Sequence, residues 1–304
     1  MAVATDTSEF RYLPAQAERL GTAVPPARRI SLPLGDGRTI SALRFGDEPP
    51  EVTFLHGAGL NAHTWDAVVL LLGRPALVID LTGHGDSSWR GDADYSPASL
   101  AADVVTAMSA WTAAPQLLVG HSLGGLTAAV VAARHPELVR ELILVDIVPG
   151  LDTDAAPAVL RDFYAVTDFA SRDEAVDRAQ HFGLGGARED AERGVFFNTR
   201  VREDGRVEWK HHFAHIIGHA FDALNAANRA TATVNPWADL TNAAGRVTLV
   251  HGTHGFLRDT DVAEFMRRLP AADVLPVDAG HNVQETAPEF LASVAARALD
   301  RTPR

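Results

Sequence analysis

Short runs of mainly apolar residues alternate along the chain with longer segments whose apolar positions recur at helical spacing. Five of these runs have four residues each and are followed by a polar residue or a glycine: 52–55, 76–79, 116–119, 142–145 and 247–250. Strands that alternate with helices predict an α/β fold with a mostly parallel sheet flanked by helices. Because ligands bind beyond the carboxyl ends of the strands in such sheets, chemistry is expected in the residues that follow these runs.

Residues 150–235 interrupt this alternation. The strand pattern gives way there to helix-like segments that are rich in aromatic residues. We interpret this segment as an inserted helical lid on a core formed by residues 1–149 and 236–304. Most of its aromatic side chains are expected to pack against the core, and a minority to line a substrate pocket.

Composition and charge exclude several classes of function. The 304 residues are 46% hydrophobic, which is enough for one large core, and 27 basic against 39 acidic residues give a net charge of -12. That charge argues against nucleic acid and anionic membranes as partners. The absence of cysteine excludes disulfides and thiolate sites. Neither a leader-like start nor an apolar stretch of about 18–20 residues is evident, so a cytoplasmic protein is predicted.

The strongest chemical signal is a serine in a glycine-rich turn. Residues 120–125 read Gly-His-Ser-Leu-Gly-Gly, a G-x-S-x-G pattern that follows a predicted strand and precedes a helix-like run. The glycines allow a sharp turn in which a larger side chain would collide with the neighbouring backbone. Ser122 is therefore the predicted nucleophile.

A serine needs a base within hydrogen-bonding reach, because its hydroxyl is a weak nucleophile. His281 follows the last strand-like run, 274–277, and lies after the other predicted elements. The chain order of serine first and histidine last fits hydrolases that use a G-x-S-x-G turn. His281 is therefore the predicted general base.

Negative charge that develops on the substrate oxygen requires two backbone N–H groups. The residue after the nucleophile, Leu123, is expected to supply one of them. The second is expected from Ala58, which lies in the His-Gly-Ala-Gly segment 56–59 directly after a predicted strand. His56 itself is interpreted as a structural residue that hydrogen-bonds this loop.

With these motifs, the chain resembles the α/β-hydrolase superfamily, in the lidded branch that holds many bacterial esterases, lactonases and carbon-carbon bond hydrolases. The matching segments are 56–59, 80–87, 120–125 and 279–283, within a resemblance that spans roughly residues 28–300. The resemblance implies an α/β-hydrolase fold. It specifies the fold strongly and the substrate only weakly.

One departure from the family concerns the triad acid. Most members carry an aspartate after the seventh strand in a Gly-x-x-Asp pattern, but residues 252–255 here read Gly-Thr-His-Gly. Asp146 is the predicted replacement, since its position resembles that of the acid in some haloalkane dehalogenases and in zearalenone lactonases. A purely structural role for this aspartate is the alternative. Asp259 and Asp261 are weaker candidates and are expected to cap the following helix.

The predicted lid carries a row of histidines. His211, His215 and His219 are spaced four residues apart, which on a helix places three imidazoles on one face. A zinc site is one interpretation, but no glutamate completes an H-E-x-x-H pattern. These side chains are expected to line the pocket or to face solvent, and no metal site is predicted.

The combined prediction is hydrolysis of a carboxylic ester or lactone through an acyl-enzyme. Ser122 attacks, His281 moves the proton, and Asp146 orients the imidazole. The expected partner is a small-molecule ester or lactone, and no cofactor is needed. The alternatives are a carbon-carbon bond hydrolase, a cofactor-free oxygenase and a non-catalytic ligand receptor. The oligomeric state stays open, with a homodimer as one option.

Overall fold

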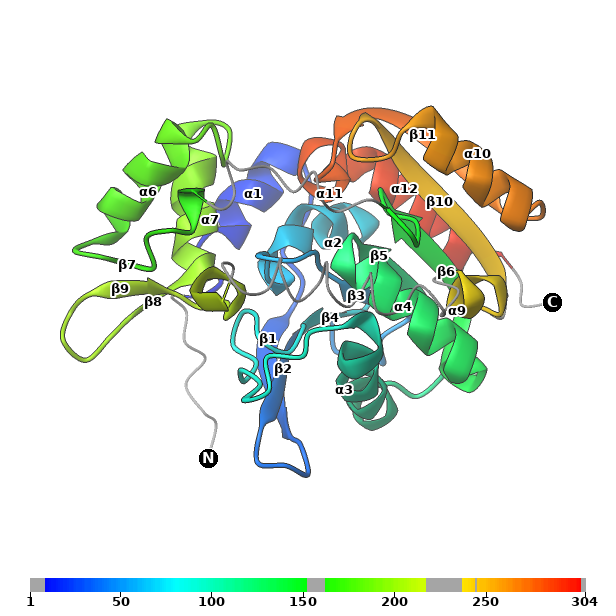
Figure 1. Cartoon of the computed structure of the whole chain (residues 1–304), viewed down its shortest axis with the longest axis horizontal. Coiled ribbons are helices and arrows are strands. Elements are labelled where there is room, and N and C mark those ends of the chain that lie inside the picture. Colours follow the sequence, from blue (N-terminus) through cyan, green and yellow to red (C-terminus); the bar gives the residue numbers. More distant parts are fainter. Residues whose placement is uncertain (1–8, 152–161, 217–236, 244, 302–304) are drawn as a thin grey trace.

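A computed structural model describes residues 9–151, 162–216, 237–243 and 245–301. Its main element is an eight-stranded sheet in the order β1-β2-β4-β3-β5-β6-β10-β11 (Figure 1). Neighbouring strands from β4 to β11 are parallel, and β1 and β2 are added antiparallel at one edge. The strands are β1 (Ala27–Pro33), β2 (Thr39–Phe45), β3 (Val52–Leu55), β4 (Ala76–Asp80), β5 (Gln116–His121), β6 (Val139–Val145), β10 (Arg246–His254) and β11 (Asp273–Gly280). The predicted mostly parallel sheet is confirmed.

Burial explains which strands the sequence reveals. The five predicted runs are β3, β4, β5, β6 and β10, and these strands are buried along most of their length. A strand that is covered on both faces is a continuous apolar run in sequence. The edge strand β1 and its neighbour β2 were not predicted. Strand β2 is mostly buried, but Thr39, Ser41 and Arg44 interrupt its apolar residues. Because β1 is only partly buried and carries two arginines, it lacks such a run.

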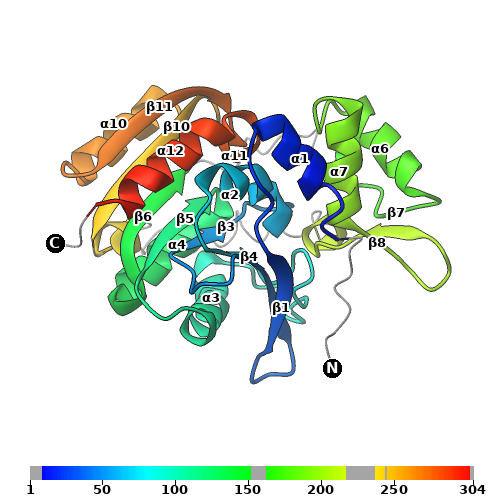
Figure 2. The same ribbon diagram turned by 180° about the vertical axis from the view of Figure 1, so that it is seen from behind.

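Helices cover both faces of the sheet, as Figures 1 and 2 show from opposite sides. One face packs against α1 (Leu13–Leu20), α2 (Asp66–Leu72) and α12 (Pro288–Leu299), and the other against α3 (Pro97–Trp111), α4 (Leu123–Arg134) and α9 (Ala238–Thr241). Shorter or peripheral helices are η1 (Ala62–Trp65), η2 (Pro136–Leu138), α10 (Asp259–Arg268) and α11 (Val283–Thr286). In the described part of the chain, no helix has the length and apolar character needed to cross a membrane.

Residues 162–216 form a separate layer at the end of the molecule opposite α10 (Figures 1 and 2). They contain α6 (Arg172–His181), α7 (Arg188–Asn198) and a small antiparallel sheet of β7 (Asp168–Phe169), β8 (Thr199–Val201) and β9 (Val207–Trp209). The prediction of a helical lid over 150–235 did not include these strands, which are too short to give a period-two pattern. The parts of that range at 152–161 and 217–235 lie outside the described residues.

An ion pair buried beneath α7 joins this layer to the core. The Arg193 guanidinium donates to the Asp66 carboxylate at 3.0 Å and to the backbone carbonyl of His63 at 2.5 Å. Asp66 is fully buried and also accepts from the His63 ring at 3.0 Å. The Phe197 ring stacks on that imidazole at 3.7 Å. A buried carboxylate thus depends on a side chain from the outer layer.

Replacing Arg193 by methionine is expected to lower the free energy of unfolding by about 2–3 kcal/mol, because it leaves the Asp66 carboxylate buried with one partner fewer. Chemical denaturation followed by circular dichroism measures this effect. Arg188→Met, at the start of the same helix, is the control. Its exposed ion pairs with Asp177 and Glu192 predict no measurable change. Equal stability of the two variants would contradict the prediction.

Candidate active site

Ser122 lies in a strained turn between β5 and α4. Its backbone is left-handed, with φ 50° and ψ −121°. A Cβ at Gly120 would lie 2.4 Å from the carbonyl oxygen of Gly124, and a Cβ at Gly124 would lie 2.5 Å from that of His56. Only glycine fits at these two positions, so the G-x-S-x-G spacing is set by close backbone contacts. The side chain of Ser122 remains partly exposed.

Asp146 and His281 come together from the ends of β6 and β11. The Nδ1–H of His281 donates to Oδ2 of Asp146 at 2.8 Å. The carboxylate is fully buried and accepts two backbone N–H groups as well, from Gly252 at 3.0 Å and from Phe256 at 2.9 Å. Because Nδ1 carries the hydrogen of this bond, Nε2 of His281 is the nitrogen that can accept a proton.

Gly255 stands where the family usually places its acid, and the structure gives a steric reason for the glycine. A Cβ at this position would lie 2.1 Å from Oδ2 and 2.5 Å from Cγ of Asp146. The carboxyl group of Asp146 therefore occupies the space that a side chain at position 255 would need. The two acid positions are mutually exclusive in this backbone.

His281 is held by two further groups that the sequence did not indicate. The ring of Phe256 stacks on the imidazole, with centroids 3.7 Å apart and planes at 14°. Nε2–H of His121 donates to the backbone carbonyl of His281 at 3.0 Å. Burial lowers the pKa of His121, so this ring is neutral. The place of His121 inside the serine motif was the available signal for its role.

The loop that carries Ala58 lies against the nucleophile turn. A Cβ at Gly57 would lie 3.2 Å from Cβ of Ser122, which shows how closely the two backbones approach. His56 fixes this loop, because its Nδ1–H donates to the carbonyl of Gly57 at 2.8 Å and its Nε2 accepts the N–H of Leu81 at 3.0 Å. Ala58 is exposed, and Leu123 is the first residue of α4.

A family model for the alpha/beta hydrolase fold matches residues 50–288. The chain belongs to the α/β-hydrolase family. The family and fold predicted from the sequence are confirmed. This α/β hydrolase is also 34% identical to Esterase Rv0045c of Mycobacterium tuberculosis, over 97% of each chain.

Two further comparisons support the assignment of this α/β hydrolase. A solved structure of the M. tuberculosis esterase Rv0045c has a TM-score of 0.81 at 33% identity, and covers 98% of this chain and 100% of that one. The sn-1-specific diacylglycerol lipase ABHD11 of Mus musculus is 26% identical, over 79% of this chain and 78% of its own length. The similarity thus extends over the core and the inserted layer.

The weaker acid candidates of this α/β hydrolase lie at the start of α10. The Asp261 carboxylate accepts the backbone N–H of Arg258 at 2.9 Å and its guanidinium at 3.0 Å. This is the capping arrangement expected from the sequence. Asp259 is the first residue of the helix. The described residues thus place Asp146 beside the imidazole and Asp261 in a cap.

Trp89 of the core contacts the outer layer formed by residues 162–216. Its ring stacks on His212 at 4.5 Å, and its Nε1–H donates to the carbonyl of Lys210 at 2.6 Å. The neighbouring Tyr95 hydroxyl lies 2.7 Å from Nδ1 of His212. In the described part of the chain, no group of three or more histidine, aspartate or glutamate side chains is placed to hold a metal ion. His219 lies outside the described residues.

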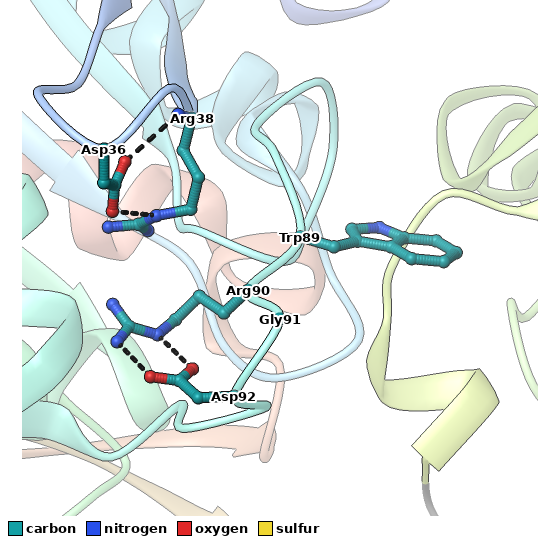
Figure 3. Close-up of a pocket in the computed structure, with 6 residues that line it drawn as sticks. All are labelled: Asp36, Arg38, Trp89, Arg90, Gly91 and Asp92. Carbon is teal, nitrogen blue, oxygen red and sulfur yellow. Dashed lines mark hydrogen bonds and ion pairs between the residues drawn. The ribbon is translucent and has the colours of Figure 1, made fainter.

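A polar surface pocket of about 250 Å³ lies beside Trp89. Figure 3 shows that the Trp89 ring points away from the charged residues that line it, toward the outer layer. Arg38 pairs there with Asp36, and Arg90 pairs with Asp92. Its charges are therefore compensated, and its lining includes neither Ser122 nor His281. This pocket is not the candidate active site.

Proposed function

We propose that this α/β hydrolase cleaves carboxylic esters, and lactones by the same chemistry, through an acyl-enzyme formed on Ser122. The observation that carries the proposal is the 2.8 Å contact between the buried Asp146 carboxylate and His281, whose ring lies 4.6 Å from that of His121, the residue before Ser122. The similarity to an esterase over almost the whole chain supports an ester as the substrate class.

The proposed steps assign one role to each residue of the predicted site. Nε2 of His281 takes the Ser122 proton as Oγ attacks the ester carbonyl, and Asp146 stabilises the imidazolium. The tetrahedral oxyanion accepts hydrogen bonds from the N–H groups of Ala58 and Leu123. The imidazolium then protonates the leaving alcohol oxygen. Water, deprotonated by His281, hydrolyses the acyl-enzyme and restores the serine.

Inside a lactone, the leaving oxygen stays tethered to the acyl group. Attack by Ser122 opens the ring, and the same imidazolium protonates the released alkoxide. No additional residue is required for this step. Lactone opening releases no separate alcohol, so it is followed by titration of the acid that it produces, with a linear ester measured in the same way.

The direct test is to look for the acyl-enzyme. Mixing the protein with p-nitrophenyl acetate should release a burst of about one equivalent of p-nitrophenol, and peptide mass spectrometry should find the acetyl group on Ser122. The control is Ser293→Ala, a change on the distant helix α12, which should leave the burst intact. Absence of a burst together with an unmodified Ser122 would contradict the proposal and favour a ligand receptor.

A further inference from the structure

Two buried histidines face each other between the core and the outer layer. His84 follows β4 and is 2% exposed, and His211 follows β9 and is 1% exposed. Their rings are nearly parallel, with centroids 6.2 Å apart and planes at 17°. In each ring Nε2 is buried and has no hydrogen-bond partner among the described residues. Such atoms are costly unless something else binds them.

Hydrogen bonds at the other nitrogens set the two tautomers. Nδ1 of His211 accepts the backbone N–H of Ala214 at 3.2 Å, so the ring hydrogen is on Nε2, which is a donor. Nδ1 of His84 lies 3.3 Å from the carbonyl of Thr82 and can only donate to it, so Nε2 of His84 is an acceptor. The pair thus offers one free donor and one free acceptor.

The pair carries no charge. Burial lowers the pKa of His84 to about 3 and lowers that of His211 well below its ordinary value. A neutral site of this kind does not compensate a carboxylate or an ammonium ion. A donor beside an acceptor fits a hydroxyl group, which can accept one hydrogen bond and donate another.

Tyr164 connects the two histidines to the proposed oxyanion loop. Its ring lies edge-on to His211, with centroids 5.0 Å apart. Its hydroxyl would be 2.9 Å from a Cβ at Gly59, the residue after Ala58, so it reaches the proposed oxyanion loop. Burial raises the pKa of Tyr164, so the hydroxyl keeps its proton.

The order of the strands places this group on the acyl side of the site. Ser122 follows β5; Asp146 and His281 follow β6 and β11 on one side of it, while His84 follows β4 on the other. The leaving oxygen must lie beside His281, which protonates it. The acyl part of the ester therefore extends toward β3 and β4, where the two histidines lie.

We propose that His84, His211 and Tyr164 bind a hydroxyl group on the acyl part of the substrate, which makes hydroxyacyl esters the preferred substrate class. This inference rests on the proposed ester hydrolysis. Nε2–H of His211 donates to the substrate hydroxyl, and that hydroxyl donates to Nε2 of His84. The Tyr164 hydroxyl closes the subsite toward the oxyanion loop.

The test compares kcat/KM for p-nitrophenyl butyrate with that for its 2-hydroxy and 3-hydroxy counterparts. Asparagine places an amide atom where Nδ1 was and removes Nε2. His211→Asn and His84→Asn therefore retain the bonds to Ala214 and Thr82, and they lose the proposed contacts together with the ring packing. His212→Asn, the neighbouring residue, is the matched control. Thermal melting shows which variants fold.

For wild type and His212→Asn, we expect at least one hydroxylated ester to be preferred by about tenfold or more, and we expect the ratio to fall toward one in His84→Asn and His211→Asn. Equal rates on all three esters in wild type, or an unchanged ratio in the folded asparagine variants, would overturn the subsite. If neither asparagine variant folds, the test uses Tyr164→Phe. A fall in the ratio of kcat/KM for the hydroxylated and plain esters supports the subsite, and an unchanged ratio overturns it.

Failure of the ester hydrolysis itself would be recognised separately. If wild type cleaves none of the esters, binding of butyramide and its hydroxylated counterparts is measured by tryptophan fluorescence, because Trp209 lies beside His211. Tighter binding of a hydroxylated amide to wild type, lost in the asparagine variants, supports the subsite without catalysis. Equal binding of all the amides rejects it.

Discussion

Replacing Ser122 by alanine is expected to lower kcat for p-nitrophenyl butyrate by about 10⁶-fold, because the acyl-enzyme can no longer form. Alanine removes a single hydroxyl from a partly exposed side chain, so the melting temperature should change little. The remaining rate would come from the proposed oxyanion N–H groups and from substrate binding. Steady-state kinetics on purified protein, free of contaminating esterase, measures the loss.

Ser122 and His281 are proposed to act in the same step, so their losses of activity should not be additive. His281→Ala should lose about as much activity as Ser122→Ala, and the double variant should be no slower than either single variant. Losses that multiply in the double variant would show that the two residues act independently. The proposed proton transfer from Ser122 to His281 would then be wrong.

Replacing Asp146 by asparagine is expected to lower kcat by about 10⁴-fold. Both carboxylate oxygens accept hydrogen bonds, from two backbone N–H groups and from the His281 ring. Asparagine has only one acceptor oxygen, so its NH₂ group must face either a backbone N–H or the imidazole. With the NH₂ group at the Oδ2 position, His281 loses the tautomer that accepts the serine proton. With the NH₂ group at the Oδ1 position, it faces the Gly252 N–H, and the neutral side chain no longer stabilises the imidazolium. Asp259→Asn is the control and should stay within about threefold of wild type.

Moving the carboxylate from position 146 to position 255 is a second test of the role proposed for Asp146. Gly255→Asp alone should abolish activity, because its Cβ would collide with the Asp146 carboxyl group. In the Asp146→Ala background that space is free, and Gly255→Asp should recover activity by about tenfold or more over Asp146→Ala alone. Near-wild-type activity in Asp146→Asn would move the acid to another residue.

The buried strands of the central sheet were predictable because each is an apolar run bounded by a turn residue. Edge strand β1 was not, since its partly exposed residues include Arg28 and Arg29. The strands of the outer layer also escaped prediction. Each has two or three residues, and their pairing depends on a turn at Gly205 with φ 81°. The Asp204-Gly205 pair is typical of hairpin turns, but strands this short give too little alternation to be recognised with it.

Within the candidate site, the strand ends indicated Ser122, Asp146 and His281 because a parallel sheet brings its carboxyl ends to one edge. The structure places the Asp146 and His281 side chains in contact, and their catalytic roles stay a prediction. The donation from His121 to the loop of His281 was not predictable, since it joins atoms 160 residues apart in sequence. The pairing of His84 with His211 depends likewise on how the outer layer docks.

Ser122 and Asp146 each follow the last residue of a strand, His121 in β5 and Val145 in β6. These two last residues are register partners in the parallel ladder of β5 and β6. Strand β10 and the turn after it contribute one N–H group each to Asp146, from Gly252 and Phe256, and the Phe256 ring stacks on His281. Any residue except proline can donate a backbone N–H. Substitutions at positions 253 and 254 therefore leave the hydrogen bonds of Asp146 in place, whereas any side chain at position 255 would collide with its carboxyl group. Relatives with the same arrangement are expected to have an aspartate at the position of Asp146 together with a glycine at the position of Gly255. A sequence search that looks for the acid only after the seventh strand would miss them.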